Sequence, residues 1–281
     1  MQNAATLRSF PAVSRPASRP LPQAPAADAP RLATHCCNCS LRELCLPCGM
    51  GAQGSAHVEE LSFGRRRIKR GEHAYRAGDG FASLYAIRSG CFRSSLLHED
   101  GREQVIGFFI AGDVMGMDGI GEGRQACDAV ALEDSEVCVI PFAQLERMSC
   151  KIPALQQQFH RMMGREIVRD HGIMLLLGSM SAEERVAAFL LNLSKRYAAR
   201  GYSAAHFNLR MTREDIGSYL GLKLETVSRA FSRFHDEGMI AVHNKSIEIR
   251  DCDRLQAVIG GNDQRRPPRV AQRANGVALA A

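Results

Sequence analysis

The spacing of apolar residues changes along the chain, and this change limits the fold more than any other feature. Between residues 60 and 142, short apolar or alternating runs are separated by turn signals at regular intervals. Two such runs are residues 83–87 and 104–110. Short strands joined by turns predict a small barrel or roll rather than βαβ units. From about residue 151 the spacing becomes helical, so the sequence predicts an α+β protein whose strands come first.

The first helical segment carries a seam of apolar residues with one acid inside it. Met163, Ile167, Asp170, Met174 and Leu177 follow one another at spacings of four and three residues, which is the pattern of an a/d seam. Such a helix either packs into its own domain or pairs with a second copy of itself. In a symmetric pair the two copies of Asp170 face each other and repel. We therefore expect a dimer interface at this seam that is weak and easily switched.

The most specific pattern lies in the last third of the chain, after a helix expected over residues 182–199. Residues 212–215 (Thr-Arg-Glu-Asp) are typical of a capped helix start, and Gly221 ends that short helix. A second helix is expected over residues 223–237, and two short strands then flank a turn. This order predicts a winged helix-turn-helix. The expected apolar stripe of the second helix is Leu224, Val227, Phe231 and Phe234.

Three polar residues lie opposite that stripe, in the N-terminal half of the second helix. Glu225, Ser228 and Arg229 are spaced so that they project together, and this half of such a helix enters the major groove of DNA. Arg can bind guanine through two hydrogen bonds, and Glu can accept one from cytosine. The alternative is a solvated face on which Glu225 and Arg229 form an ion pair. The surrounding helix-turn-helix favours DNA binding.

The net charge of the chain by itself does not argue for DNA. Four arginines and one aspartate lie in each of the segments 1–34 and 262–281, and these two segments account for the whole formal charge of +6. Both are rich in polar residues and proline and have no apolar period, so we expect a disordered arm and a disordered tail. No apolar run approaches the length of a membrane helix. We therefore expect a cytoplasmic protein.

Five of the ten cysteines lie within thirteen residues, at positions 36, 37, 39, 45 and 48. In a cytoplasmic protein such a group indicates metal ligands or redox groups rather than disulfides. Cys36, Cys39, Cys45 and Cys48 have the spacing of two C-x2-C pairs, although the gap between the pairs is short for a zinc site. The spacing therefore leaves a local zinc site open.

Several motifs together resemble the FNR branch (fumarate and nitrate reduction regulators) of the CRP/FNR transcription factors. The resemblance covers residues 35–260, in the order expected for that family. Its motifs are His35-Cys36-Cys37-Asn38-Cys39-Ser40-Leu41-Arg42-Glu43-Leu44-Cys45-Leu46-Pro47, Leu84-Tyr85-Ala86-Ile87-Arg88-Ser89-Gly90, Ala182-Glu183-Glu184-Arg185-Val186-Ala187-Ala188-Phe189 and Glu225-Thr226-Val227-Ser228-Arg229.

The resemblance implies a domain order. It implies a β-roll sensor of the cyclic-nucleotide-binding type with its cysteine segment over residues 35–150 and a dimerisation helix over 151–180. A winged helix-turn-helix over 181–261 completes it. It also implies an oxygen-labile 4Fe–4S cluster bound by Cys36, Cys39, Cys45 and Cys138, and a homodimer that reads an inverted repeat of TTGAT through Glu225, Ser228 and Arg229. RNA polymerase is the further partner implied.

The chain departs from this family's pattern in two places. Cys37 and Cys48 are extra thiols beside the implied ligands. In the segment that corresponds to the phosphate cassette of the cyclic-nucleotide relatives, residues 112–125, Met117 replaces the ribose-binding Glu and Arg124-Gln125 replaces the Arg-Ser or Arg-Thr pair. A buried phosphodiester would lack its charged partner there. We therefore expect no cyclic nucleotide.

Two alternative functions remain open at this point. One is a regulator of the same fold with a different effector, such as haem bound by His35 or His98, or a small ligand. The other is a zinc-stabilised interaction module, which leaves the helix-turn-helix unexplained. The sequence contains no P-loop and no G-x-S-x-G motif, and its nine histidines are scattered. We therefore expect a protein that is not an enzyme.

Overall fold

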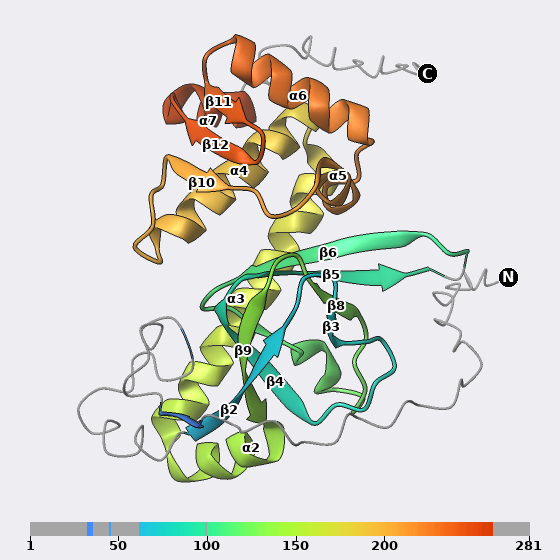
Figure 1. Ribbon diagram of the computed structural model, residues 1–281, viewed down its shortest axis with the longest axis vertical. Helices are drawn as coiled ribbons and strands as arrows, with labels where there is room; N and C mark the ends of the chain where they lie inside the picture. The colour runs from blue at the N-terminus through green and yellow to red at the C-terminus, as the bar shows by residue number, and fades with distance from the viewer. Residues whose placement is uncertain (1–32, 36–44, 46–61, 99, 261–281) are drawn as a thin grey trace, which may run out of the picture. The chain divides into compact units, whose positions relative to one another are not determined.

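The computed structural model describes residues 33–35, 45, 62–98 and 100–260 (Figure 1). The chain forms two compact units that divide between Met163 and Gly164. This division falls inside the longest helix, α3 (Pro153–Ser179), so each unit contains a part of that helix.

The first unit is built mainly from short strands. These are β1 (Ala33–His35), β2 (Ser62–Ile68), β3 (His73–Tyr75), β4 (Ser83–Ser89), β5 (Cys91–Leu97), β6 (Glu103–Ile110), β7 (Val114–Met115), β8 (Asp128–Ala131) and β9 (Ser135–Pro141).

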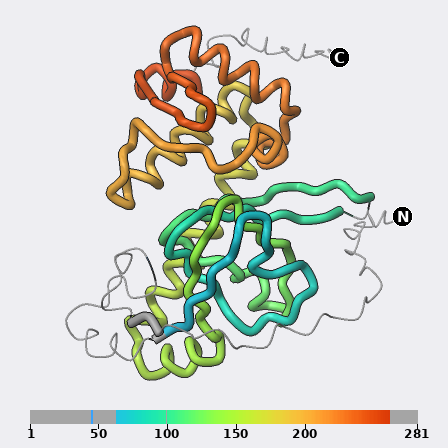
Figure 2. The backbone as a smooth tube through the Cα atoms, in the orientation of Figure 1, coloured from blue at the N-terminus to red at the C-terminus, as the bar shows by residue number. Residues whose placement is uncertain are grey.

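The strands pair antiparallel in two sheets, with the orders β1-β2-β9-β4-β7 and β3-β8-β5-β6. The backbone trace shows β5 and β6 running side by side as a long hairpin (Figure 2). Gly90 joins β4 to β5 with a φ of 97°, and a Cβ there would collide with Ser135. The roll predicted from the turn spacing is confirmed. β1 begins at Ala33, two residues inside the segment predicted as a disordered arm.

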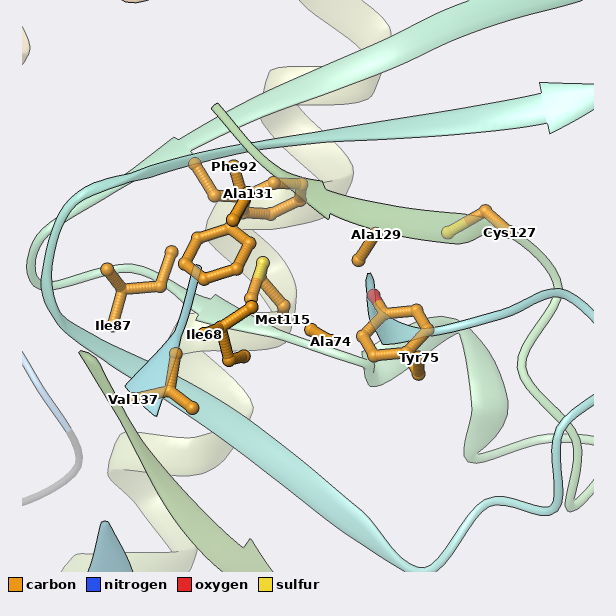
Figure 3. Close-up of a cluster of buried hydrophobic side chains, with 11 residues drawn as sticks. Ile68, Ala74, Tyr75, Ile87, Phe92, Met115, Cys127, Ala129, Ala131 and Val137 are labelled. Atoms are coloured by element: carbon orange, nitrogen blue, oxygen red, sulfur yellow. The ribbon is translucent and has the colours of Figure 1, made fainter. Parts of the chain in front are cut away.

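Two apolar clusters hold the first unit together. One fills the interior of the roll, where Ile68, Ile87, Phe92, Met115 and Val137 are almost completely buried (Figure 3). The other packs the five-stranded sheet against α2 (Phe142–Lys151) and the first half of α3. Burial of large apolar side chains is the main stabilising term in such a roll.

Helical structure begins earlier than the sequence predicted. The change in spacing placed the first helix from about residue 151, and α3 confirms that helix. The structure adds α2 before it, and Ile152 separates the two helices with extended backbone angles. Leu145, Met148, Ile152 and Leu155 already have helical spacing, and all four belong to the sheet-facing cluster. α2 is only ten residues long, which is too short for its helical spacing to stand out in the sequence.

The second unit contains a helical core and a small sheet. Its remaining elements are α4 (Ala182–Ala198), β10 (His206–Asn208), α5 (Arg213–Leu220), α6 (Leu224–Asp236), β11 (Ile240–His243), β12 (Ser246–Ile249) and α7 (Cys252–Gly260).

The predicted helix-turn-helix and wing are confirmed as α5, α6 and the β11–β12 hairpin. Thr212 and Asp215 form the predicted capping box at the start of α5, and Gly221 ends that helix with a φ of 62°. Two further elements were not predicted from the sequence: β10, which pairs with β12, and α7. Within the described residues no helix is both long and apolar enough to cross a membrane.

One member of the predicted apolar stripe is wrong. Leu224 is exposed, whereas Val227, Phe231 and Phe234 are buried as predicted. Ala230 supplies the fourth buried position of α6 instead. Leu224 is the first residue of the helix, where the chain has only just turned away from α5, so its side chain has not yet reached the core.

Candidate functional site

The predicted base-reading residues lie on the solvent side of α6. Glu225 and Arg229 are exposed and Ser228 is half-buried, opposite the buried stripe of the same helix. The Nη2 group of Arg229 lies 3.5 Å from the Oγ1 atom of Thr226. Within the described part of the chain, no ion pair joins Arg229 to Glu225. The face therefore presents an arginine and a carboxylate that are not paired with each other.

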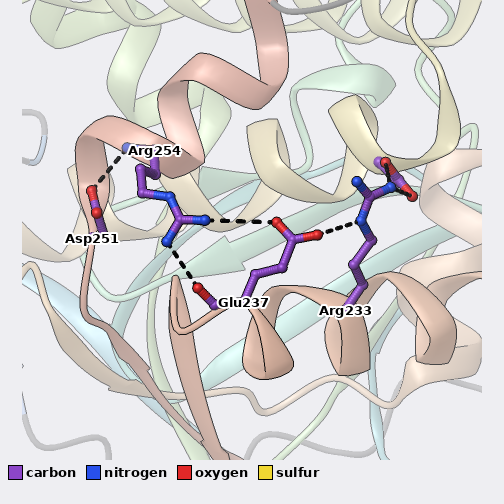
Figure 4. A network of polar contacts seen from close by, with 5 residues as sticks. Arg233, Glu237, Asp251 and Arg254 are labelled. Carbon is purple, nitrogen blue, oxygen red and sulfur yellow. Dashed lines mark hydrogen bonds and ion pairs between the residues drawn. The ribbon is translucent and has the colours of Figure 1, made fainter.

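A network of ion pairs fixes the C-terminal end of α6 against α4 and α7 (Figure 4). The Nη1 group of Arg233 donates to both carboxylate oxygens of Glu183 at 2.5 and 2.6 Å, and its Nε donates to Glu237 at 2.7 Å. Arg254 donates to the backbone carbonyl of Glu237 at 2.9 Å. Exposed pairs contribute little singly, but together they restrict the orientation of the helix.

The first helix of the motif is held against α6 by a stacked arginine. The guanidinium of Arg213 lies over the ring of Phe231, with 3.5 Å between Cζ and the ring centroid. Burial lowers the pKa of Arg213. A desolvated cation over an aromatic face stabilises contacts of this kind by about 2 kcal/mol. Together with the buried stripe, this contact sets how α6 projects from the unit.

Arg185 joins three backbone segments of the second unit. Its guanidinium donates to the carbonyl oxygens of Leu177 at 2.8 Å, Met180 at 2.9 Å and Leu220 at 3.0 Å. These carbonyls lie at the end of α3, in the connection to α4, and at the end of α5. Helix C-termini have unpaired carbonyl groups with partial negative charge, which a guanidinium satisfies well.

From the sequence, Arg185 is recognised only as a member of a family motif. Its role in joining helix ends was missed. One signal was available, since a basic residue in the first turn of a helix is unfavourable for that helix itself. Partners outside the helix offset this unfavourable position.

The predicted seam on α3 is largely exposed in the single chain. Ile167 is 55% exposed and Met174 is 67% exposed, Asp170 and Leu177 are exposed, and Met163 is half-buried. Isolated exposed apolar residues are common, but a line of them along one helix indicates an interaction surface.

The exposed apolar surface of α3 is wider than the predicted seam. Val168 and Leu175 are 70% and 63% exposed and lie on an adjacent face. They are seven residues apart, the spacing that places two residues on the same side of a helix. That spacing could have identified them from the sequence.

Asp170 also lies close to α5. Burial raises the pKa of Tyr219 on that helix, and the nearby carboxylates of Asp170 and Glu166 raise it further, whereas Arg169 and Arg196 oppose them. Glu166 and Arg169 pair with each other. Charged residues of α3 and α4 thus influence a buried tyrosine of the helix-turn-helix within the second unit.

Two of the four predicted cluster ligands, Cys45 and Cys138, lie in the described part of the chain. Cys138 lies on β9, opposite Arg65 of β2 and Ala86 of β4, and is 8% exposed. It belongs to the apolar cluster that faces α2 and α3. Cys45 packs against this same cluster. Two cysteines distant in the sequence, one partly buried and one buried, therefore pack against the same apolar cluster.

The other cysteines of this group, Cys36, Cys37, Cys39 and Cys48, lie outside the described residues. The backbone of β1 pairs with β2, and His35, directly before Cys36, lies opposite Ser62. Among the residues that can be described, no three His, Cys, Asp or Glu side chains are grouped to hold a metal ion. The ligand set therefore stays a prediction.

The alternative haem ligand His98 lies at the exposed tip of the β5–β6 hairpin. Its Nδ1 atom is 3.0 Å from the carboxylate of Asp100, and its side chain is 65% exposed. A haem ligand needs a largely apolar pocket, which this position does not provide. The side chain of His35 lies outside the described residues.

Comparison with known proteins agrees with this architecture. Residues 65–149 match the cyclic nucleotide-binding domain family, and residues 184–258 match the Crp-like helix-turn-helix domain family. Among solved structures, FixK2 from Bradyrhizobium japonicum is similar with a TM-score of 0.65 and 32% sequence identity. That similarity covers 70% of this chain and 98% of FixK2.

Curated relatives are similar over most of the chain. The transcriptional regulatory protein btr of Bordetella pertussis is 46% identical over 228 residues, which cover 81% of this chain and 94% of btr. The fumarate and nitrate reduction regulatory protein of Escherichia coli K12 is also 46% identical over 228 residues, which cover 81% of this chain and 91% of that protein. These relatives are transcription regulators rather than enzymes. The chain therefore belongs to the CRP/FNR family of transcription regulators.

Proposed function

We propose that the protein is an oxygen-responsive transcription regulator that holds a 4Fe–4S cluster through Cys36, Cys39, Cys45 and Cys138. The observation that carries this proposal is the packing of Cys45 and Cys138 against one apolar cluster. A zinc site made from Cys36, Cys39, Cys45 and Cys48 gives no reason for Cys138 to share an environment with Cys45. The cluster proposal requires these two residues to lie close together.

The residues present fit such a group. Thiolates are the ligands that iron–sulfur clusters need, normally four of them. Burial against apolar side chains restricts access of water, which is one of the ways in which proteins tune clusters. When bound, the cluster would supply a centre that reacts with oxygen. Cys138 lies on β9, which is paired with a strand on both sides, and this supports a fixed position for its thiol.

The chain's own residues would convert the state of this site into dimerisation. Ligation of one cluster by Cys138 of the roll and by the N-terminal cysteines would hold that segment on the unit that contains the first half of α3. We propose that homodimerisation uses the seam on α3, where the two copies of Asp170 repel each other. When the cluster is lost, the N-terminal segment would lose its contacts with that unit. The repulsion between the two copies of Asp170 would then no longer be offset, and the dimer would separate.

DNA binding follows from dimerisation. We propose that Glu225, Ser228 and Arg229 read a TTGAT half-site, and that two copies of α6 read an inverted repeat. A monomer must capture each half-site separately and therefore binds such a site poorly. We further propose that the protein contacts RNA polymerase and acts in the cytoplasm. We also propose that it needs no cyclic nucleotide.

The proposal is tested by the iron and sulfide content of protein purified without oxygen, with an absorption spectrum before and after exposure to air. We expect about four irons and four sulfides per chain and a broad absorption that disappears in air. A zinc content of one per chain without sulfide would instead support the interaction module. A sharp Soret band would support haem as the effector.

A further inference from the structure

In the cassette of the first unit, residues 112–125, the carboxylate of Asp118 binds backbone amides of the chain. It includes β7 and a short 3-10 helix, η2 (Met117–Gly119), which follows Gly116 with a φ of 91°. The next strand, β8, starts directly after the cassette, at Asp128. Asp118 is the middle residue of η2. It lies at the surface, but its carboxylate turns back toward the start of β8.

This carboxylate accepts hydrogen bonds from two consecutive backbone amides. Oδ2 of Asp118 accepts from the N–H of Ala126 at 2.8 Å and from the N–H of Cys127 at 3.2 Å. The thiol of Cys127 donates to the same oxygen at 3.4 Å, and the hydroxyl of Tyr75 donates to Oδ1 at 3.4 Å. Consecutive amides that point at one oxygen are the arrangement by which loops bind phosphate.

Of the two side chains that replace the Arg-Ser or Arg-Thr pair, one donates to the chain itself and the other is buried. The guanidinium of Arg124 donates to the carbonyl of Gly78 at 2.9 Å. Gln125 is 3% exposed, and its Oε1 atom has no hydrogen-bond partner. Its Nε2 atom lies on the inner side, near Gly116. The consecutive amides of Ala126 and Cys127, directly after the cassette, are thus already occupied by a carboxylate of the chain itself.

We propose that Asp118 is a built-in anion that occupies the phosphate position of the cassette and closes the cassette onto β8. The sensor roll then keeps this conformation without any cyclic nucleotide or free phosphate. This inference concerns the roll alone and does not depend on the cluster. It predicts that removal of the carboxylate creates an anion site that the natural protein lacks.

Hydrogen exchange in the full-length protein, read by mass spectrometry over residues 124–128, tests this directly. In the unaltered protein we expect slow exchange that is the same in inorganic phosphate and in chloride of equal ionic strength. In Asp118→Ala the two amides lose their acceptor, and exchange should be at least about tenfold faster. Added phosphate should slow it again in this variant, and chloride should not.

Two further variants complete the experiment. Asp118→Asn keeps an oxygen acceptor at the same place, so its exchange should be close to that of the unaltered protein and insensitive to phosphate. Asp134→Ala removes another carboxylate that accepts one backbone amide, from Arg70 at 3.0 Å, outside the cassette. It should leave residues 124–128 unchanged. Unchanged exchange in Asp118→Ala, or faster exchange that phosphate does not slow, would overturn the proposal.

Discussion

The guanidinium of Arg185 donates a hydrogen bond to the backbone carbonyl of Leu220, with 3.0 Å between Nη1 and the oxygen. Arg185 belongs to α4, and Leu220 is the last residue of α5. The same guanidinium holds Leu177 at the end of α3. One side chain therefore links the helix that carries the predicted dimer seam to the first helix of the helix-turn-helix.

Arg185→Ala should destabilise the second unit by about 3 kcal/mol, because three carbonyls lose a charged donor. The loss is smaller than the sum of three separate hydrogen bonds, because contributions within one network are not additive. Arg185→Lys should recover part of this loss, because an ammonium group cannot span all three acceptors. Denaturant unfolding followed by circular dichroism measures both. Lys195→Ala, an exposed residue of the same helix, is the control. Equal stability of Arg185→Ala and this control would contradict the structural role.

Arg229→Ala should weaken specific DNA binding by about 1–3 kcal/mol, the contribution of one good two-bond contact with a base. The preference at the guanine position of the half-site should flatten, while binding to unrelated DNA persists. Binding to a set of single-base variants of the site measures this. His235→Ala, at the exposed C-terminal end of α6, should change neither quantity. Full discrimination at every position in Arg229→Ala would exclude Arg229 as a base-reading residue.

Asp170→Ala should produce a dimer that survives air, because two facing carboxylates are removed whether or not the cluster is present. Asp170→Asn should behave similarly, since it removes the charge and keeps the size. Sedimentation of aerated protein gives the oligomeric state. Asp253→Ala removes an equal charge at an exposed position on α7 and should remain monomeric in air. If aerated Asp170→Ala is also a monomer, Asp170 does not lie on the seam.

Cys138→Ala should abolish the colour, the anaerobic dimer and specific DNA binding together, because a methyl group cannot replace a thiolate ligand. Cys48→Ala should keep all three. The two variants separate the cluster from the local zinc site, which share Cys36, Cys39 and Cys45. The reverse outcome, a colourless Cys48→Ala beside a coloured Cys138→Ala, would place the ligand set in the N-terminal segment alone.

The stability of the roll should fall at alkaline pH. Burial, with the charge of Asp118 next, raises the pKa of the Cys127 thiol, and burial likewise raises the pKa of Tyr75. The folded state therefore keeps protons that the unfolded chain releases above about pH 9. Stability present below that pH should decline by up to about 1.4 kcal/mol per pH unit for each group.

Urea midpoints at pH 7.5, 9 and 10 measure this decline. In Cys127→Ala the decline of stability just above pH 9 should be smaller. The variant is less stable at every pH, because a buried side chain is shortened. Cys252→Ala removes an exposed thiol and should leave the pH dependence unchanged. A pH profile of Cys127→Ala that is parallel to that of the unaltered protein would contradict the role of Cys127.

The elements that the sequence predicted correctly depend on local rules. The capping box at Thr212, the turn at Gly221 and the helical spacing of α3 each involve residues within a few positions of one another. Such residues meet in the same way whenever the helix forms. The alternation of short strands and turns likewise predicted a roll. The first turn of α6 and the helix α2 escaped these rules, because their burial depends on the neighbouring elements.

The sequence by itself thus determined the roll, the helix-turn-helix with its wing, the family and most of the buried stripe of α6. Only the tertiary structure decided which distant groups meet. Arg185 finds carbonyls at the ends of two other helices, the carboxylate of Asp118 turns to the amides before β8, and Cys45 shares a cluster with Cys138. Periodicity specifies which side of an element faces inward, but it does not specify which residue of another element lies there. That choice is made by strand register and packing, which bring together groups that are far apart in the chain.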